Sequence, residues 1–367
     1  MEAKKKHIVI IGGSYAGVWG AKTICTKLKD DVRVTLISPN TYAYFNIAAP
    51  RILVEPEKVE KALFSLSDLL NRFSSKIELL EGRVVKADLE EKTVHYTTQN
   101  ETRTVNYDYL VIASGVSMET NCLQNELEGK RVVEEIKKMN QEIQQAKSIV
   151  ILGGGPTGAE VAGELGYYYG QTKDITVITG KTGPLTLMGE NASKKAEVLM
   201  RELNISVIND VKYTWCETLS SRTRVHLENG TSMEVDLVIN TAICKPNTDF
   251  LEQKYVDEKE YLKTDQYFRL KDHNEVIGLG DVLAIGARSL FDLLHYQIPT
   301  FATFVNTLSD KNKNQLKPYQ KPKQTTVIPI SEKGGVGLFY GWQVPSFLVR
   351  LSKGRDYMLG RAENYYK

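Results

Sequence analysis

The stretch SIVILGGGPTG, residues 148–158, decides the fold class of this chain. A short apolar strand runs into Gly153, Gly155 and Gly158, which have the spacing G-x-G-x-x-G, and a helical pattern follows over 157–169. The first glycine permits a tight turn, the second lets backbone approach a pyrophosphate, and the third lets the helix pack on the strand. Free N–H groups at the helix N-terminus then attract the phosphates. The stretch therefore predicts a dinucleotide-binding turn, and the alternative is an ordinary strand–helix turn.

A second such stretch, HIVIIGGSYAG, occupies residues 7–17. Ser14 stands at its middle glycine position between Gly12 and Gly17, and the apolar strand 32–38 follows the helix, so a βαβ unit is expected. Ser is small enough for close approach, and its hydroxyl group can bond a phosphate. The two turns lie 141 residues apart, which predicts a duplicated fold unit and an α/β protein with two Rossmann-like dinucleotide-binding domains.

Neither unit carries the acidic residue that usually ends the second strand. The first unit has Ser38 and Asn40 there, and the second has Thr179 and Lys181. A carboxylate at this place holds a ribose 2′-hydroxyl and repels a 2′-phosphate. Its absence beside Lys181 leaves room for NADPH, although a merely solvated lysine is an equal alternative.

Two acidic residues elsewhere lie at places where a ligand could meet them. Asp281 follows the apolar strand 276–279, where it can bond a ligand hydroxyl or cap a helix. Glu160 lies in the first turn of the helix after the second glycine turn, where the helix dipole favours its charge. Simple dipole complementation is the alternative for Glu160. The five histidines are scattered, so no metal site is predicted.

Composition excludes several classes of protein. The chain has 367 residues, 42% of them hydrophobic and 25% charged, which is typical of a globular protein with two or three domains. The sequence contains no run of 18 apolar residues, so no membrane-spanning helix is predicted. The net charge of +2 argues against broad nucleic-acid binding. The four cysteines form no close pair, so we expect neither a disulfide framework nor a dithiol motif.

The C-terminal part differs in charge from the rest. Residues 311–367 hold 11 basic and 3 acidic side chains, a net charge of +8, which leaves −6 for residues 1–310. This asymmetry indicates an anionic or membrane partner, and a solvated basic tail is the alternative. After Pro345, apolar and basic residues alternate at roughly helical spacing, so an interfacial amphipathic helix is one expectation and packing on the protein's own core or on a dimer partner is the other.

Several further elements follow from periodicity. One face of 57–73 is apolar, which predicts a helix, and further helices are expected near 126–146 and over 289–309. The polar stretch 310–324 predicts a linker, and a strand is expected to begin near residue 325.

These motifs together resemble the flavoprotein superfamily with two dinucleotide-binding domains, in which the second domain is inserted in the first. The segments ASG at 113–115 and GLGD at 278–281 match the closing motifs of the first domain. The segments at 44–51 and 334–359 are similar to the ferroptosis suppressor or apoptosis-inducing-factor-like group of flavoprotein quinone reductases, particularly its fungal members. The resemblance implies the following domains. They are an FAD-binding domain at 1–120 and 263–324, an NAD(P)H-binding domain at 121–262, and a small C-terminal module at 325–367.

The resemblance also implies a set of cofactor-binding residues. For FAD they are Gly12, Ser14, Tyr15, Ala16, Gly17, Ser38, Asn46, Arg51, Val84, Ala113, Ser114, Gly115 and Asp281. For NADPH or NADH they are Gly153, Gly155, Pro156, Thr157, Gly158, Glu160, Thr179 and Lys181. Glu160 and Arg51 are the expected catalytic residues. Glu160 would lie near the nicotinamide, and Arg51 would stabilise negative charge on the reduced flavin or the quinone, with Tyr44 or Phe45 packed near the ring.

The activity implied is that of an FAD-dependent NAD(P)H:quinone oxidoreductase. A type II NADH dehydrogenase of a respiratory membrane is one alternative, and a non-enzymatic redox-sensing or DNA-binding death effector is another. The expected partners are a quinone-type acceptor, a membrane surface met through the C-terminal segment, and a second copy in a homodimer. The expected location is the cytoplasm, including the cytosolic face of a membrane, lipid droplet or mitochondrion. Glu2 stands where N-myristoylation requires glycine, so no myristoyl anchor is expected.

Overall fold

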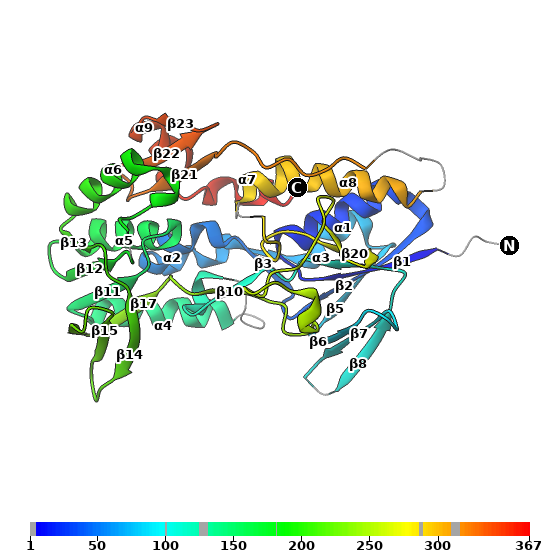
Figure 1. The fold of residues 1–367 in the computed structure, drawn as a ribbon, viewed down its shortest axis with the longest axis horizontal. Coiled ribbons are helices and arrows are strands. Elements are labelled where there is room, and N and C mark those ends of the chain that lie inside the picture. Colours follow the sequence, from blue (N-terminus) through cyan, green and yellow to red (C-terminus); the bar gives the residue numbers. More distant parts are fainter. Residues whose placement is uncertain (1–4, 100, 125–130, 181, 286–288, 310–315) are drawn as a thin grey trace.

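Two sheets form the frame of the molecule, the first parallel except for the pairing of β19 with β20 and the second fully parallel (Figure 1). The computed structural model describes residues 5–99, 101–124, 131–180, 182–285, 289–309 and 316–367. The first sheet has the strand order β19-β20-β9-β1-β2-β5. Its strands are β1 Lys6–Ile11, β2 Val32–Ser38, β5 Ile77–Glu81, β9 Tyr109–Ile112, β19 Arg269–Leu270 and β20 His273–Gly278. Strand β20 joins the sheet from far along the chain, so the second unit is inserted in the first.

The second sheet repeats this design on a smaller scale. Its order is β13-β12-β11-β17, and all its pairings are parallel. Its strands are β11 Ser148–Leu152, β12 Asp174–Ile178, β13 Ile205–Ile208 and β17 Leu237–Asn240. The apolar run of β11 is buried on both faces, because Val150 and Leu152 pack with Val225 and Val235 whereas Ile149 and Ile151 belong to the main core. The expected fold class, with two Rossmann-like units, is confirmed.

Helices connect and cover the strands of both sheets. The α-helices are α1 Tyr15–Leu28, α2 Ala49–Val54, α3 Leu66–Leu70, α4 Arg131–Gln145, α5 Pro156–Tyr169, α6 Glu190–Arg201, α7 Leu290–Asp292, α8 Ile298–Thr307 and α9 Ser346–Val349. Two π-helical turns are η8 Leu293–Gln297 and η9 Arg350–Gly354. The 3₁₀ turns are η1 Lys29–Asp31, η2 Asn46–Ala48, η3 Pro56–Ala62, η4 Asn71–Phe73, η5 Asn121–Leu123, η6 Thr186–Met188, η7 Gln253–Tyr255 and η10 Leu359–Tyr365. The helix expected near 126–146 is confirmed over 131–145, and residues 126–130 lie outside the described residues. The helix expected over 289–309 is confirmed with a π-helical turn in its middle.

Small antiparallel sheets complete the two units. One hairpin sheet contains β6 Arg83–Asp88, β7 Thr93–Thr97 and β8 Thr102–Asn106, and another contains β14 Tyr213–Thr218, β15 Thr223–Leu227 and β16 Ser232–Val235. The strands β10 Val116–Met118 and β18 Cys244–Pro246 pair where the chain crosses between the units. The domain boundaries at 120/121 and 262/263 stay predictions.

The helix expected over 57–73 is wrong. This stretch forms η3, then the strand β4 Leu63–Ser65, then α3 and η4. Strand β4 pairs with β3 Tyr42–Tyr44, and Ser65 Oγ accepts a hydrogen bond from Asp68 N at 3.3 Å, which caps α3. The pairing with β3 is a tertiary contact, which outweighs the local helical pattern.

The last part of the chain forms a compact module on top of the second unit (Figure 1). Its sheet contains β21 Thr326–Pro329, β22 Gly335–Phe339 and β23 Trp342–Val344, followed by α9, η9 and η10. The chain then returns to the junction of the two units, where Tyr366 is buried and stacks on Tyr15 with 4.9 Å between ring centroids. The described part of the expected linker, residues 316–324, has no regular structure, and the rest lies outside the described residues.

Candidate functional site

One cavity of about 1360 Å³ runs through the junction of the two units and the C-terminal module. Pockets for a single small ligand usually have about 300–1,000 Å³, so this cavity has room for more than one ligand. It begins at the N-terminus of α1, passes the N-terminus of α5, and opens among apolar side chains of the module. The carboxyl ends of the first sheet's strands therefore face the same space as the second glycine turn.

The first glycine turn forms one end of the cavity. Gly12, Ser14 and Ala16 line it, and Gly12 has a φ of +112°, which favours glycine. A Cβ atom at Gly12 would lie 2.3 Å from the Ala113 carbonyl oxygen. Ser14 is the N-cap of α1, but its side chain makes no capping bond. The first N–H groups of this 14-residue helix and the Ser14 hydroxyl therefore face the space that a phosphate would need.

Asp281 lies beside this end, directly after the strand β20. Its side chain lines the cavity, and burial together with the nearby Asp292 raises the pKa of Asp281 to about 6. Gln297 fixes the turn before it, because its Oε1 atom accepts a hydrogen bond from Gly280 N at 2.9 Å. A hydroxyl donor from a ligand would stabilise the charged form of this carboxylate.

The second glycine turn reaches the same cavity. Gly155 and Thr157 line it, and Gly155 is the N-cap of α5 with nothing within 4 Å of an added Cβ. Gly153 has a φ of +113°. A Cβ at Gly158 would lie 2.0 Å from the Gly153 carbonyl oxygen, so that glycine serves close helix–strand packing. The open space is thus at the middle glycine, where a pyrophosphate would approach.

Glu160 also lines the cavity, one turn into α5. Its carboxylate forms an ion pair with the ammonium group of Lys353, which comes from the C-terminal module. Their side chains are only 8% and 12% exposed. Burial raises the pKa of Glu160, and the positive charge of Lys353 opposes this. The helix after the second glycine turn and the C-terminal module thus meet in one buried charge pair.

Arg51 does not lie where we expected. Its guanidinium is 2% exposed, is absent from the cavity lining and forms a buried ion pair with Glu164 of α5, with 2.5 Å between Nε and Oε2. Tyr44 and Phe45 are fully buried and also absent from the lining. The geometry therefore does not support charge stabilisation by Arg51 beside the flavin ring, since the Glu164 carboxylate and two backbone carbonyl groups already bind its donors.

Most of the other expected residues do meet at the cavity. The expected residues that line it are Gly12, Ser14, Tyr15, Ala16, Ser38, Asn46, Val84, Ala113, Ser114, Gly115, Asp281, Gly155, Pro156, Thr157 and Glu160. Gly17, Gly153 and Gly158 serve the turns without lining the cavity. Thr179 does not line it either, because its hydroxyl donates to Asn209 Oδ1 at 2.8 Å. Lys181 lies outside the described residues.

The residues that close the apolar end of the cavity were not among the predicted site residues. They are contributed by α7, η8 and the C-terminal module, and include Phe291, His295, Phe339, Leu348 and Leu351. The predicted residues also did not include Thr241 and Ala242, which follow the strand β17 beside the second glycine turn. Glycine spacing gives a local signal, whereas these residues are brought together only by long-range packing.

The lining fits two dinucleotides. The helices α1 and α5 each point an N-terminus without a side-chain cap at the cavity, and their N-cap residues, Ser14 and Gly155, are small. Within the described ranges, no group of three or more His, Cys, Asp or Glu side chains is arranged to hold a metal ion. The same residues contain no helix long and apolar enough to cross a bilayer. All four cysteines are free, and among them Cys244 lines the cavity.

Comparison with known proteins agrees with this geometry. Residues 6–304 match the family described as pyridine nucleotide-disulphide oxidoreductase. The chain is 31% identical to oxidoreductase ptaL of Pestalotiopsis fici over 94% of both chains, and 23% identical to human ferroptosis suppressor protein 1 over 97% of this chain and 94% of that one.

Solved structures show the same fold. The sulfide:quinone oxidoreductase of Aquifex aeolicus superposes with a TM-score of 0.74 at 20% identity, over 98% of this chain and 92% of that one. The resemblance to the ferroptosis suppressor and apoptosis-inducing-factor-like flavoproteins is confirmed. The chain belongs to the pyridine nucleotide-disulphide oxidoreductase family and is an oxidoreductase.

Proposed function

We propose that this chain is an FAD-dependent NAD(P)H:quinone oxidoreductase. The observation that carries the proposal is the single cavity, which joins two helix N-termini suited to pyrophosphates and opens at an apolar end. FAD would be held at the first turn and Asp281, and NAD(P)H at the second turn. The flavin supplies the redox chemistry when bound, and the protein supplies orientation and electrostatics.

The protein's own contribution centres on Glu160 and Lys353. Both residues line the cavity and are largely shielded from water, so their charges act more strongly than in solvent. We propose that Glu160 orients the nicotinamide end of NAD(P)H and that Lys353 holds Glu160 in its ionised form. The apolar end lined by Phe291, Phe339 and Leu348 fits a quinone better than a charged acceptor.

An acceptor screen tests the proposal directly. The purified holoprotein, supplied with NADPH, is expected to reduce a short-chain ubiquinone analogue faster than ferricyanide or a small disulfide. The relatives include a ferroptosis suppressor protein, and the fold neighbours include a sulfide:quinone oxidoreductase. Turnover with none of several quinones, or a clear preference for a disulfide, would contradict the quinone assignment.

A type II NADH dehydrogenase is the second enzymatic candidate. The type II enzyme of Plasmodium falciparum superposes with a TM-score of 0.63 at 18% identity, which supports the shared fold alone. A strict requirement for NADH and coupling to a respiratory chain in isolated membranes would favour that candidate. DNA affinity that falls steeply with salt would instead favour the death-effector candidate.

The chain is expected to use NADPH at least about as well as NADH. No carboxylate ends the second strand of the inserted unit, because Thr179 and Gly180 stand there. Lys181 follows in the sequence, and a lysine beside a 2′-phosphate in solvent contributes about 1 kcal/mol. This permits about a five-fold preference for NADPH over NADH at most. Steady-state kcat/KM values for both nucleotides check this prediction. A value for NADH about a hundred-fold above that for NADPH would contradict it.

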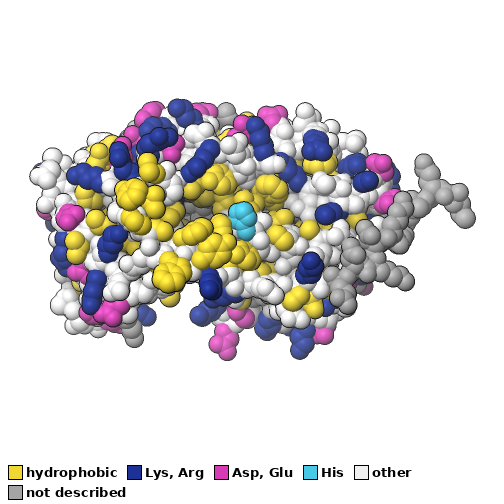
Figure 2. All heavy atoms as spheres, turned by 90° about the horizontal axis from the view of Figure 1, so that it is seen from above, with side chains coloured by type: hydrophobic (Ala, Val, Ile, Leu, Met, Phe, Trp, Pro, Cys, Tyr) yellow, Lys and Arg dark blue, Asp and Glu magenta, His cyan; other side chains and the backbone are white. Residues whose placement is uncertain are grey.

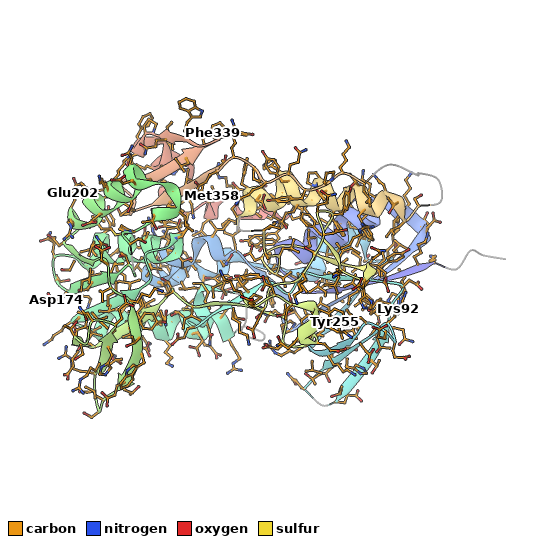
Figure 3. The ribbon with its side chains drawn as sticks, viewed as in Figure 1. Lys92, Asp174, Glu202, Tyr255, Phe339 and Met358 are labelled. Carbon is orange, nitrogen blue, oxygen red and sulfur yellow. The ribbon has the colours of Figure 1, made fainter. Side chains whose placement is uncertain are left out.

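We propose that the apolar end of the cavity faces a membrane, where lipid quinones reside. Its rim carries exposed aromatic and aliphatic side chains, which are Phe339, Tyr340, Trp342, Phe347, Leu348 and Leu351. Figure 2 shows hydrophobic side chains gathered in the middle of this face, with lysines and arginines around them. Phe339 projects from the module, whereas Met358 lies between the module and the two units (Figure 3).

This patch differs from the amphipathic helix expected after Pro345. The helical stretch consists of α9 and the π-helical turn η9, residues 346–354, and it exposes Phe347, Leu348 and Leu351. Met358 and Leu359 beyond it are half-buried, and Lys353 turns inward to Glu160. Exposed Arg350 and Arg355 remain available for anionic lipids. The site of action would then be the cytosolic face of a membrane, a lipid droplet or a mitochondrion.

Vesicle sedimentation is expected to separate this patch from the rest of the surface. The double variant Trp342→Ser/Phe347→Ser removes side chains that are 79% and 59% exposed and do not line the cavity. Since full burial of one such side chain contributes about 1.5–3 kcal/mol, binding to anionic vesicles should fall at least about ten-fold. Flavin content should not change.

Trp215→Ser is the matched control, because Trp215 is 53% exposed on β14 at the opposite side of the second unit (Figure 1). It should pellet like the wild type. Equal pelleting of the double variant and the wild type at low salt would show that the patch is not a membrane contact.

A further inference from the structure

Arg51 and Glu164 form an ion pair at the junction of three parts of the chain. Arg51 lies on α2 of the first unit, and Glu164 lies on α5 of the inserted unit. The guanidinium binds the carboxylate with two contacts, Nε to Oε2 at 2.5 Å and Nη2 to Oε1 at 3.2 Å. The side chains are 2% and 0% exposed, so this pair lies entirely inside the protein.

The remaining donors of Arg51 bind the C-terminal module. Nη1 donates to the carbonyl oxygen of Arg355 at 3.2 Å, and Nη2 donates to that of Gly354 at 3.3 Å. The guanidinium also lies 5.4 Å from the ring centroid of buried Tyr357. One guanidinium therefore fixes the turn that directly follows Lys353.

The helix α5 connects this anchor to the cavity. Glu160 and Glu164 are four residues apart, so they lie on the same face of the helix. Glu164 holds Arg51, and Glu160 holds Lys353 at the cavity wall. The ring of Tyr357 lies between these pairs, 5.5 Å from the Lys353 ammonium group as well. The position of Lys353 thus depends on where Arg51 holds residues 354 and 355.

Stability alone is a weak explanation for such a pair. Desolvation of two charges can exceed their attraction, and well-packed apolar residues of similar volume often stabilise a protein equally well. A planar guanidinium with five donors in a fixed geometry does something that apolar residues cannot, because it orients several acceptors at once. Here the acceptors are the Glu164 carboxylate of the inserted unit and the carbonyl groups of Gly354 and Arg355 in the C-terminal module.

We propose that Arg51 and Glu164 are positioning residues that hold the C-terminal module in register, so that Lys353 meets Glu160. The positioning itself is a property of this chain, and only its effect on hydride transfer rests on the proposed function. The pair acts through Lys353 and touches no ligand.

Hydrogen exchange of the protein as purified, without added pyridine nucleotide, tests the positioning. The variant Arg51→Met/Glu164→Leu removes both charges and keeps the volume. The amides of Arg355 and Tyr357, which bond to Arg350 O at 2.9 Å and Lys353 O at 2.8 Å, should exchange about ten-fold faster or more. Arg33→Met/Glu78→Leu removes an exposed pair, 59% and 46% accessible, and should leave these amides unchanged.

Single-turnover reduction by NADPH provides the second readout. The double variant should slow it as much as Lys353→Met does, and the triple variant should be no slower than Lys353→Met alone, because both changes act on one contact. Arg51→Lys keeps the positive charge but not the planar set of donors. The amides of Arg355 and Tyr357 should therefore exchange at a rate between those of the wild type and the double variant. Should the double variant not fold, Arg51→Lys decides the question.

Wild-type exchange at the amides of Arg355 and Tyr357 in Arg51→Met/Glu164→Leu and in Arg51→Lys would overturn the proposal, as would additive slowing in the triple variant. These outcomes are distinct from a failure of the proposed function. In that case the wild-type protein itself would hold no flavin or would not respond to NADPH, whereas the exchange comparison would still report on the position of the module.

Discussion

Replacing Gly17 with alanine is expected to yield a protein that has lost its flavin. A Cβ atom at this position would lie 1.8 Å from the carbonyl oxygen of Gly12, an atom of the rigid turn itself. The helix α1 must therefore move away from β1, and its N-terminal N–H groups move with it. FAD affinity should fall at least about ten-fold, a loss of about 1.4 kcal/mol or more, measured as flavin absorbance per chain after purification. A glutamate at the same position should be worse.

Gly20→Ala is a control on the same helix. A Cβ at Gly20 would lie 3.4 Å from a Leu279 methyl group, which is ordinary contact, and alanine is the better helix former by about 1 kcal/mol. This variant should keep its flavin and its thermal stability. Full flavin occupancy in Gly17→Ala would remove the first glycine turn from the FAD site.

Glu160→Gln is expected to keep the yellow colour but to slow flavin reduction by NAD(P)H about a hundred-fold. The change leaves the Lys353 ammonium group buried without its counter-charge, so Lys353 should move and the wall of the cavity with it. Misplacement of a reacting group by about 1 Å can itself reduce a rate about a hundred-fold. Stopped-flow absorbance in a single turnover measures this step apart from binding.

Glu190→Gln provides the matched control, because Glu190 pairs with Lys194 on the surface of α6, where both side chains are more than 70% exposed. It should reduce its flavin at the wild-type rate. An unchanged single-turnover rate in Glu160→Gln would exclude a role of this carboxylate in hydride transfer.

The cofactor turns could be predicted from sequence because their signal is local. Gly153, Gly155 and Gly158 lie within six residues, and their steric roles follow from spacing alone. The place of Asp281 after an apolar strand left a ligand contact and a helix cap open, and the resemblance favoured the ligand contact. Resemblance supplied Asn46, Val84 and the inserted topology, which local patterns do not contain.

The errors have a common physical origin in long-range contacts. Arg51 was expected at the flavin, but it pairs with Glu164, which is 113 residues away in the sequence. The residues around Arg51 contain no pattern that predicts this partner. Lys353 was read as part of a basic surface, whereas it turns inward to a carboxylate 193 residues away. The apolar face of 57–73 is compatible with a helix, but in the structure Leu63–Ser65 forms the strand β4, which pairs with β3. In each case a tertiary partner decided the outcome.

An anaerobic titration of the purified protein tests whether it transfers electrons from NAD(P)H through a bound flavin to a quinone. We expect a yellow protein with about one FAD per chain, whose absorbance near the flavin maximum is bleached by about one equivalent of NADPH or NADH. Addition of a short-chain quinone should then restore the colour without oxygen. A protein that holds no flavin when purified or supplied with FAD, or a flavin that neither nucleotide bleaches, would contradict the account.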